Sequence, residues 1–89
     1  MIVRISVFKT AIALGIVLGA LHFCWSALVA IGQAQPVINF VFWMHFIRPA
    51  YVVESFELIR ALVLLGVTAS IGFLLGGLFA FMWNSLHRE

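Results

Sequence analysis

ALVLLGVTASIGFLLGGLFAFMW, residues 61–83, is an uncharged apolar run with glycine, threonine and serine among its leucines and phenylalanines. A second run, TAIALGIVLGALHFCWSALVAI, occupies residues 10–31. A helix needs about 20 residues to cross about 30 Å of hydrocarbon at about 1.5 Å per residue. Because backbone groups in lipid must be hydrogen-bonded within the chain, both runs are predicted to be helices. The predicted fold class is an all-α membrane protein, an antiparallel hairpin of two transmembrane helices.

The composition supports the same class. The chain has 89 residues, of which 65% are hydrophobic and 9% charged, with a net charge of +2. A soluble domain of this size buries only about 60% of the surface that its unfolded chain exposes, so this much apolar surface needs an apolar solvent. The lipid bilayer is the predicted partner. No basic run is long enough to follow phosphates, so no nucleic-acid partner is expected.

The first run has an alternative interpretation as a cleaved signal peptide. Arg4 and Lys9 precede it, and small residues at positions 30 and 32 resemble a cleavage site. Signal peptides have an apolar core of roughly 7–15 residues, and this run is longer. The sequence therefore favours a retained helix.

The connection contains a shorter apolar and aromatic segment, PVINFVFWMHFI, at residues 36–47. It is too short to cross a bilayer. Pro36 suits the start of a helix and Pro49 prevents its continuation, so a short helix at the membrane interface is predicted. Tryptophan and basic side chains favour the headgroup boundary, and the predicted anchors there are Trp43, His45, Arg48 and Arg60. The segment either caps and anchors the hairpin or docks a partner.

The second helix is predicted over residues 53–84, with residues 61–83 inside the membrane. Glu54 and Glu57 fall at its expected start, where acidic side chains complement the helix dipole. Arg60 lies three residues after Glu57 and can pair with it on one face. No catalytic residue is predicted, because nothing nearby supplies the partner that acid–base chemistry by these carboxylates needs.

The positive residues predict the orientation of this single membrane domain, residues 1–89. Lys and Arg near helix ends are enriched on the cytoplasmic side. The terminal side carries three and the loop side two: Arg4, Lys9 and Arg88 against Arg48 and Arg60. Both termini are therefore expected in the cytoplasm, and the expected location is a bacterial inner membrane.

Small residues recur every four positions in both runs and so fall on one face of each helix. The rows are Ala11, Gly15 and Gly19 in the first run, and Thr68, Gly72, Gly76 and Ala80 in the second. Lipid gives helices little hydrophobic drive to associate, so close backbone approach replaces it, and small residues permit that approach. Both rows are predicted to form a helix-packing interface, either within the chain or against another copy or a larger partner.

His22 is an ionisable side chain about midway through the first run. Such groups are costly inside a membrane and often functional. One interpretation is a neutral imidazole hydrogen-bonded to Thr68 or Ser70 at the same depth. The other is a cofactor ligand, such as an axial haem or chlorophyll ligand, with a partner supplying the second histidine. No metal site is predicted, because His22 and Cys24, two apart on a helix, point apart; beyond this role of His22, no cofactor is expected.

The second half combines a Pro-x-Tyr element, a glycine-rich helix and an aromatic-Asn pair, in Pro49-x-Tyr51, Gly72, Gly76 and Trp83-Asn84. On these residues it resembles small bacterial two-transmembrane proteins of unknown function. The resemblance covers roughly half of the chain and implies no activity or site.

Three hypotheses of function follow. The leading one is a non-catalytic accessory, stabilising or assembly subunit that contacts other membrane subunits, or copies of itself, through residues 68–80 and the aromatic loop. The alternative is a homo-oligomeric pore or small transporter, whose path would be lined by Thr68, Ser70, Asn84 and His22. The third is a haem or pigment carrier that uses His22.

Overall fold

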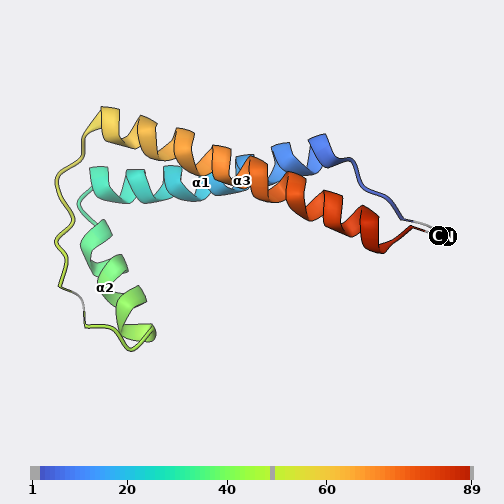
Figure 1. Ribbon diagram of the computed structural model, residues 1–89. Helices are drawn as coiled ribbons and strands as arrows, with labels where there is room; N and C mark the ends of the chain where they lie inside the picture. The colour runs from blue at the N-terminus through green and yellow to red at the C-terminus, as the bar shows by residue number, and fades with distance from the viewer. Residues whose placement is uncertain (1–2, 49, 89) are drawn as a thin grey trace.

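The computed structural model describes residues 3–48 and 50–88, and all regular structure in these residues is helical. Helix α1 spans Val7–Ala30, α2 spans Ala34–Met44 and α3 spans Leu58–Leu86. α1 and α3 lie side by side and antiparallel, and α2 leaves their loop end at a steep angle (Figure 1). The start of α1 and the end of α3 lie together at the opposite end of the hairpin (Figure 1). The predicted all-helical fold with two long apolar helices is confirmed.

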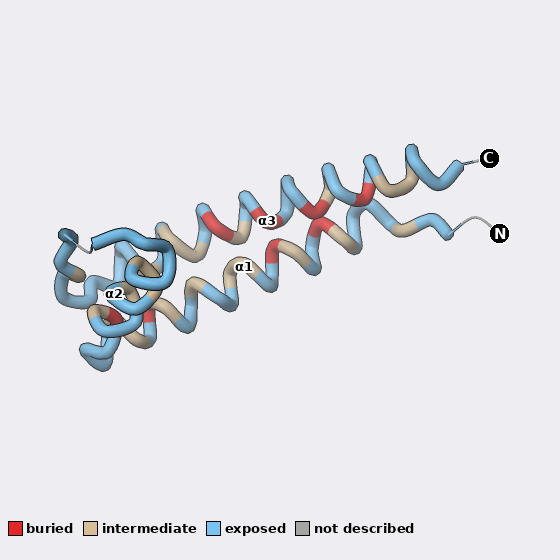
Figure 2. Tube along the Cα trace, turned by 90° about the horizontal axis from the view of Figure 1, so that it is seen from below, coloured by how far each residue is buried: buried red, intermediate tan, exposed pale blue. Residues whose placement is uncertain are grey.

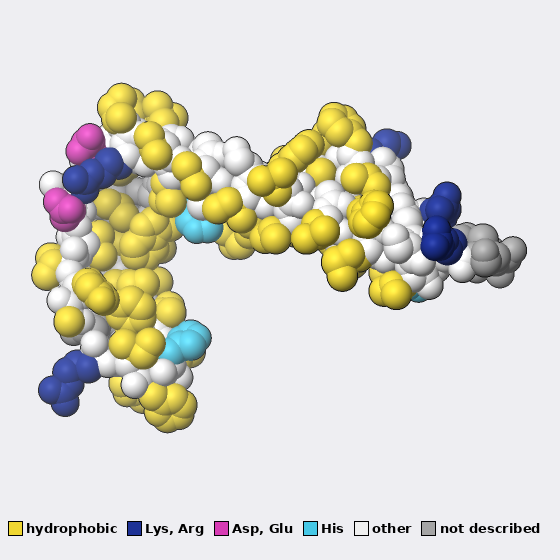
Figure 3. All heavy atoms as spheres, in the orientation of Figure 1, with side chains coloured by type: hydrophobic (Ala, Val, Ile, Leu, Met, Phe, Trp, Pro, Cys, Tyr) yellow, Lys and Arg dark blue, Asp and Glu magenta, His cyan; other side chains and the backbone are white. Residues whose placement is uncertain are grey.

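α1 and α3 are long and apolar enough to cross a membrane. They contain 24 and 29 residues, which at about 1.5 Å per residue exceeds the roughly 30 Å of a hydrocarbon core. Only 11% of the most apolar part of each helix is buried, whereas the core helix of a soluble protein is mostly buried. Figure 3 shows hydrophobic side chains along the hairpin and charged ones at its two ends.

The start of α1 lies three residues before the predicted position 10, because Ser6 caps the helix. The Ser6 Oγ accepts a hydrogen bond of 3.2 Å from the Lys9 backbone N–H. This bond satisfies one of the N–H groups that the first turn leaves without a partner.

α1 and α2 end in the same hydrogen-bonded motif, in which a left-handed residue follows the last turn. In α1 that residue is Gly32, at φ +78°, and in α2 it is Phe46, at φ +62°. The backbone N–H groups one residue further on, at positions 33 and 47, each donate a 2.8 Å bond to a carbonyl five residues back. Glycine adopts this conformation freely and phenylalanine does not. Phe46 is also fully exposed.

α2 is shifted toward the N-terminus relative to the predicted segment 36–47. Pro36 is the third residue of α2 rather than its opening residue. A proline is tolerated there because the first four N–H groups of a helix have no intrahelical partner. The helix ends at Met44 because the chain turns at Phe46.

α3 begins at Leu58, five residues after the predicted start at 53. Glu57 is extended, with φ −138° and ψ 123°. The Val53 N–H donates a 2.6 Å hydrogen bond to the Gln35 side chain, which fixes this part of the loop outside the helix. Glu54 therefore precedes the helix, and Glu57 flanks its first residue instead of lying in its first turn.

Candidate functional site

The two predicted rows of small residues face each other in the contact between α1 and α3. The buried residues of α3 are Thr68, Gly72, Gly76 and Ala80, and those of α1 are Ala11, Gly15 and Ser26. Figure 2 shows the buried segments of α3 on the side that faces α1. Gly19 is half-buried, and a Cβ placed on it would lie 3.5 Å from the Ala69 Cβ. The two rows therefore pack against each other within one chain in this structure, rather than against another copy or a partner.

Gly72 and Gly76 allow the two backbones to touch. A Cβ placed on Gly76 would lie 2.7 Å from the Thr10 carbonyl oxygen and 2.9 Å from the Ala11 Cα. A Cβ on Gly72 would lie 3.0 Å from the Gly15 Cα and closer still to the Leu14 carbonyl oxygen. These neighbours are backbone atoms, which cannot rotate away as a side chain does. We call this contact, formed by both rows, the glycine seam.

The hydroxyls near the seam bind their own helix. Thr68 Oγ1 donates to the Leu64 carbonyl at 2.7 Å, and Ser70 Oγ donates to the Gly66 carbonyl at 2.7 Å. Carbonyl groups four residues back are always within reach of such side chains in a helix. The hydroxyls of Thr68 and Ser70 are therefore satisfied within α3.

His22 follows the same rule, and the predicted hydrogen bond to Thr68 or Ser70 is wrong. The His22 Nδ1 lies 2.8 Å from the Leu18 carbonyl oxygen. A carbonyl only accepts, so Nδ1 donates in this contact, and in the neutral ring Nε2 is then the nitrogen with the free lone pair. The side chain is half-buried. An interaction within α1 thus accounts for one of its two ring nitrogens.

The described residues contain no group of three or more His, Cys, Asp or Glu side chains that could hold a metal ion. His45 and His87 follow the ends of α2 and α3, and their Nδ1 atoms lie 2.6 and 2.8 Å from carbonyls four residues back. A second axial ligand for a cofactor on His22 would have to come from another chain.

The four residues proposed to line a pore do not share a path within one chain. Thr68 is buried in the glycine seam, whereas Ser70 is exposed on another face of α3. Asn84 is bonded at the end of the hairpin that holds the termini. No single surface of the hairpin therefore carries all of these groups.

Asn84 and Trp83 fasten the N-terminal segment to α3. The Asn84 Oδ1 accepts a 2.9 Å bond from the Ile5 N–H, and its Nδ2 donates a 2.8 Å bond to the Ile5 carbonyl. The Trp83 indole N–H donates to the Val3 carbonyl at 3.0 Å. The sequence predicted Asn84 only as part of the aromatic-Asn pair and of a possible pore lining, and no local signal indicates a partner 79 residues away.

At the loop end of the hairpin, the Gln35 side chain fastens two segments together as Asn84 does at the other end. The sequence did not predict this role of Gln35. Its Oε1 accepts from the Val53 N–H at 2.6 Å, and its Nε2 donates to the Tyr51 carbonyl at 3.1 Å and to Asn39 Oδ1 at 2.9 Å. One amide therefore holds the returning loop against α2. Tyr51 adds an edge contact with Phe42, at 6.1 Å between ring centroids.

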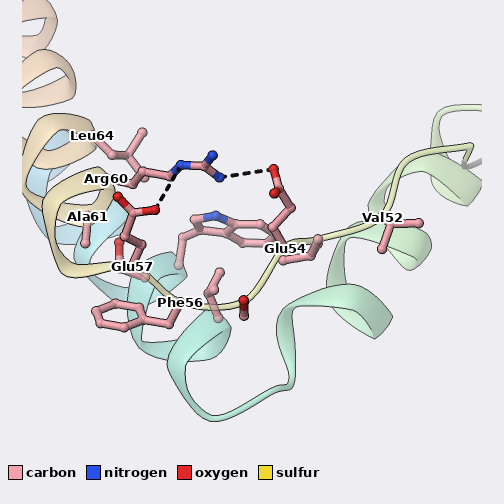
Figure 4. Close-up of a pocket in the computed structure, with 12 residues that line it drawn as sticks. Val52, Glu54, Phe56, Glu57, Arg60, Ala61 and Leu64 are labelled. Atoms are coloured by element: carbon pink, nitrogen blue, oxygen red, sulfur yellow. Dashed lines mark hydrogen bonds and ion pairs between the residues drawn. The ribbon is translucent and has the colours of Figure 1, made fainter.

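Three charged side chains form a group beside the start of α3 (Figure 4). Arg60 Nη1 lies 3.0 Å from Glu54 Oε1, and Arg60 Nε lies 3.6 Å from Glu57 Oε2. The Glu54 hydrogen bond and charge, and then the Glu57 charge, raise the pKa of Arg60, which stays protonated. Their side chains remain 56–73% exposed.

The other predicted anchors lie on and after α2. Trp43 is 71% exposed and stacks on Phe40, with 6.0 Å between ring centroids. His45 and Arg48 are exposed at and beyond the end of the helix. Arg60 belongs instead to the start of α3, so the four anchors form two groups.

No family model, curated protein or solved structure matches the chain. The candidate site combines three features: the glycine seam, the side-chain amides of Gln35 and Asn84 that fasten the two ends of the hairpin, and the charged group at the loop end.

Paired cysteines are expected to test the seam directly. In a Cys24→Ser background, Ala11→Cys with Gly77→Cys places the two Cβ atoms 3.7 Å apart, within the range that a disulfide requires. Mild oxidation is expected to remove both thiols from maleimide labelling within one chain. Ala13→Cys with Gly77→Cys is the control, because Ala13 is exposed. Equal cross-linking of the two pairs would contradict the observed packing.

Proposed function

We propose that the chain is a non-catalytic integral membrane protein in which α1 and α3 cross the bilayer, and that it is an accessory or assembly subunit of a larger membrane complex. The observation that carries the membrane proposal is the exposed surface. Large hydrophobic side chains are exposed along both helices, among them Ile16, Leu21, Val67 and Leu74, at 52–70% exposure. In water such a surface would aggregate, whereas in lipid it is solvated.

α2 would lie in the interface of the same bilayer. With the hairpin upright in the membrane, the steep angle of α2 brings its axis toward the membrane plane (Figure 1). Its exposed aromatic side chains are Phe40, Trp43 and Phe46. Tryptophan in particular favours the headgroup boundary. This placement gives the strained Phe46 a role, because insertion of its ring into lipid offsets the cost of its backbone conformation.

If α1 and α3 both cross the bilayer, the two termini lie on one side of the membrane, and the hydrogen bonds between Asn84 and Ile5 support this proposal. The cytoplasmic side of a bacterial inner membrane remains our proposal for that side. It rests on three Lys and Arg residues near the termini against two near the loop.

The surface that meets a partner must differ from residues 68–80, because α1 covers that row. α3 carries a second pair of small residues four apart, Gly66 and Ser70, on its exposed side. A Cβ on Gly66 would meet nothing within 4 Å. Small residues on an open face are typical of contacts between membrane helices. We propose that this outward pair receives a helix of the partner subunit.

Purification of the tagged chain from its native membrane in mild detergent tests this function. We expect stoichiometric recovery of larger membrane subunits. Gly66→Leu with Ser70→Leu is expected to reduce that recovery by at least about tenfold, which corresponds to about 1.4 kcal/mol.

The cysteine pair at positions 11 and 77 serves as the control, because it should still cross-link in the double variant. Recovery of the chain as a homo-oligomer that conducts ions in liposomes would instead support the pore. A visible absorption band that His22→Ala abolishes would support the pigment carrier.

A further inference from the structure

We propose that the loop end of the hairpin binds the headgroup of an aminophospholipid of the phosphatidylethanolamine class. The site is a cavity of about 210 Å³ between the end of α1, the loop residues 52–57 and the first turns of α3 (Figure 4). The inference rests on the proposed membrane span, because the cavity lies at headgroup depth only if α1 and α3 cross the bilayer.

Ser26 is the polar group that points to a ligand. It is 8% exposed and lines the cavity. Its hydroxyl forms no hydrogen bond within the part of the chain that the structure describes, whereas those of Thr68 and Ser70 do. No buried side-chain nitrogen or oxygen in the described residues lacks a partner, so the Ser26 hydroxyl is accessible, at a residue that lines this cavity and the apolar one beside it. A buried hydroxyl gains free energy when a bound group supplies its hydrogen bond.

The charges around the cavity fit a ligand that carries both signs. Glu54 and Glu57 place two carboxylates against the single guanidinium of Arg60, so the group has a net charge of −1. The carboxylates can accept hydrogen bonds from an ammonium, and the guanidinium can donate to a phosphate. Because these ion pairs are more than half exposed, they are weak and can open to a ligand.

Phosphatidylethanolamine carries an ammonium and a phosphate close together. The quaternary nitrogen of choline has no N–H to donate, and a glycerol headgroup has no positive charge. The cavity also has apolar walls, formed in part by Trp25 and Val52.

An apolar cavity beside the site can take the first part of an acyl chain. It measures about 230 Å³ and shares Ser26, Phe56 and Ala61 with the headgroup site. Its other lining residues lie on α1 and α3 and extend from the loop end, at Ala30 and Leu58, to Phe23 and Leu65 further along the hairpin. An acyl chain attached to the bound headgroup would run in this direction.

Native mass spectrometry of the full chain, released from nanodiscs of mixed phosphatidylethanolamine, phosphatidylcholine and phosphatidylglycerol, tests the proposal. We expect phosphatidylethanolamine to be retained at least about tenfold more than either other lipid, a difference of about 1.4 kcal/mol. Ser26→Ala, and separately Glu54→Gln with Glu57→Gln, should remove most of this preference. Ser70→Ala is the matched control, because its hydroxyl is exposed and bonded within α3.

Equal retention of the three lipids by a chain that spans the nanodisc would overturn the headgroup site and leave the membrane proposal intact. Displacement by free phosphoethanolamine at the same concentration as the lipid would overturn a lipid as the occupant. A chain that fails to enter the nanodisc would instead contradict the proposed function itself.

Discussion

Replacing Gly72 and Gly76 together by leucine is expected to separate α1 from α3. Each new Cβ would lie within about 3 Å of backbone atoms of α1. Overpacking costs about 1–3 kcal/mol at each site. Since about 1.4 kcal/mol is a factor of ten, the two changes together should lower the fraction of closed hairpins by well over tenfold. The measurement is cross-linking of Gly19→Cys with Ala69→Cys in the Cys24→Ser background, where the Cβ atoms lie 3.5 Å apart.

Gly66→Leu is the matched control, because its Cβ position is open. It changes the same residue type in the same helix, and cross-linking should persist. Alanine sharpens the comparison: Gly66→Ala should stabilise α3 by up to about 1 kcal/mol through helix propensity, whereas Gly72→Ala should destabilise the hairpin. Undiminished cross-linking in the double leucine variant would show that the seam does not hold the helices together.

The seam was predictable because its signal is periodic. Residues four apart share a helical face, so the rows at 11–19 and 68–80 predict which face of each helix forms a contact, even when the partner is not known. The four-residue spacing does not predict which helix packs against each row. In the structure the connection at residues 31–57, which Gln35 fastens to α2, brings α3 back against the chain's own α1.

The late start of α3 and the roles of the Gln35 and Asn84 amides could not be predicted from a periodic pattern. Glu54 and Glu57 match the composition of a first helical turn, yet a hydrogen bond from Val53 to Gln35 keeps the chain extended. That bond joins residues 18 apart, and the Asn84 clamp joins residues 79 apart. Side-chain amides offer a donor and an acceptor to any backbone that tertiary structure brings near, so no local pattern identifies their partners.

For His22, the sequence predicted the need for a hydrogen bond but not the partner that forms it. A polar ring in an apolar helix needs a hydrogen bond, and the hydroxyls of Thr68 and Ser70 were plausible acceptors at the same depth. All three groups instead use carbonyls of their own helices. The carbonyl of the same helix is the partner because a helix always presents it at a fixed distance. A partner on another helix would require a particular rotation of both helices about their axes.

Replacing Ile71 and Leu74 together by aspartate is expected to impair membrane integration strongly. Their side chains are 47% and 70% exposed near the middle of α3. In water the substitution of exposed apolar residues by aspartate would be close to neutral and would improve solubility. At the centre of a spanning helix each aspartate costs about 2.5–3.5 kcal/mol, and the lost apolar side chain adds about 0.3–0.6 kcal/mol. The fraction that resists carbonate extraction from membranes should therefore fall sharply.

Leu58→Asp with Leu86→Asp is the control, because these exposed residues lie at the two ends of α3. The composition of the chain changes equally, but the new charges remain near the headgroups, and aspartate at the helix start also complements the helix dipole. Integration should be retained in this variant. If the Ile71 and Leu74 variant were a soluble, monodisperse protein with unchanged helix content, the exposed face of α3 would not be a lipid surface. The two variants together thus separate a requirement for apolar composition from a requirement for apolar side chains at mid-membrane depth.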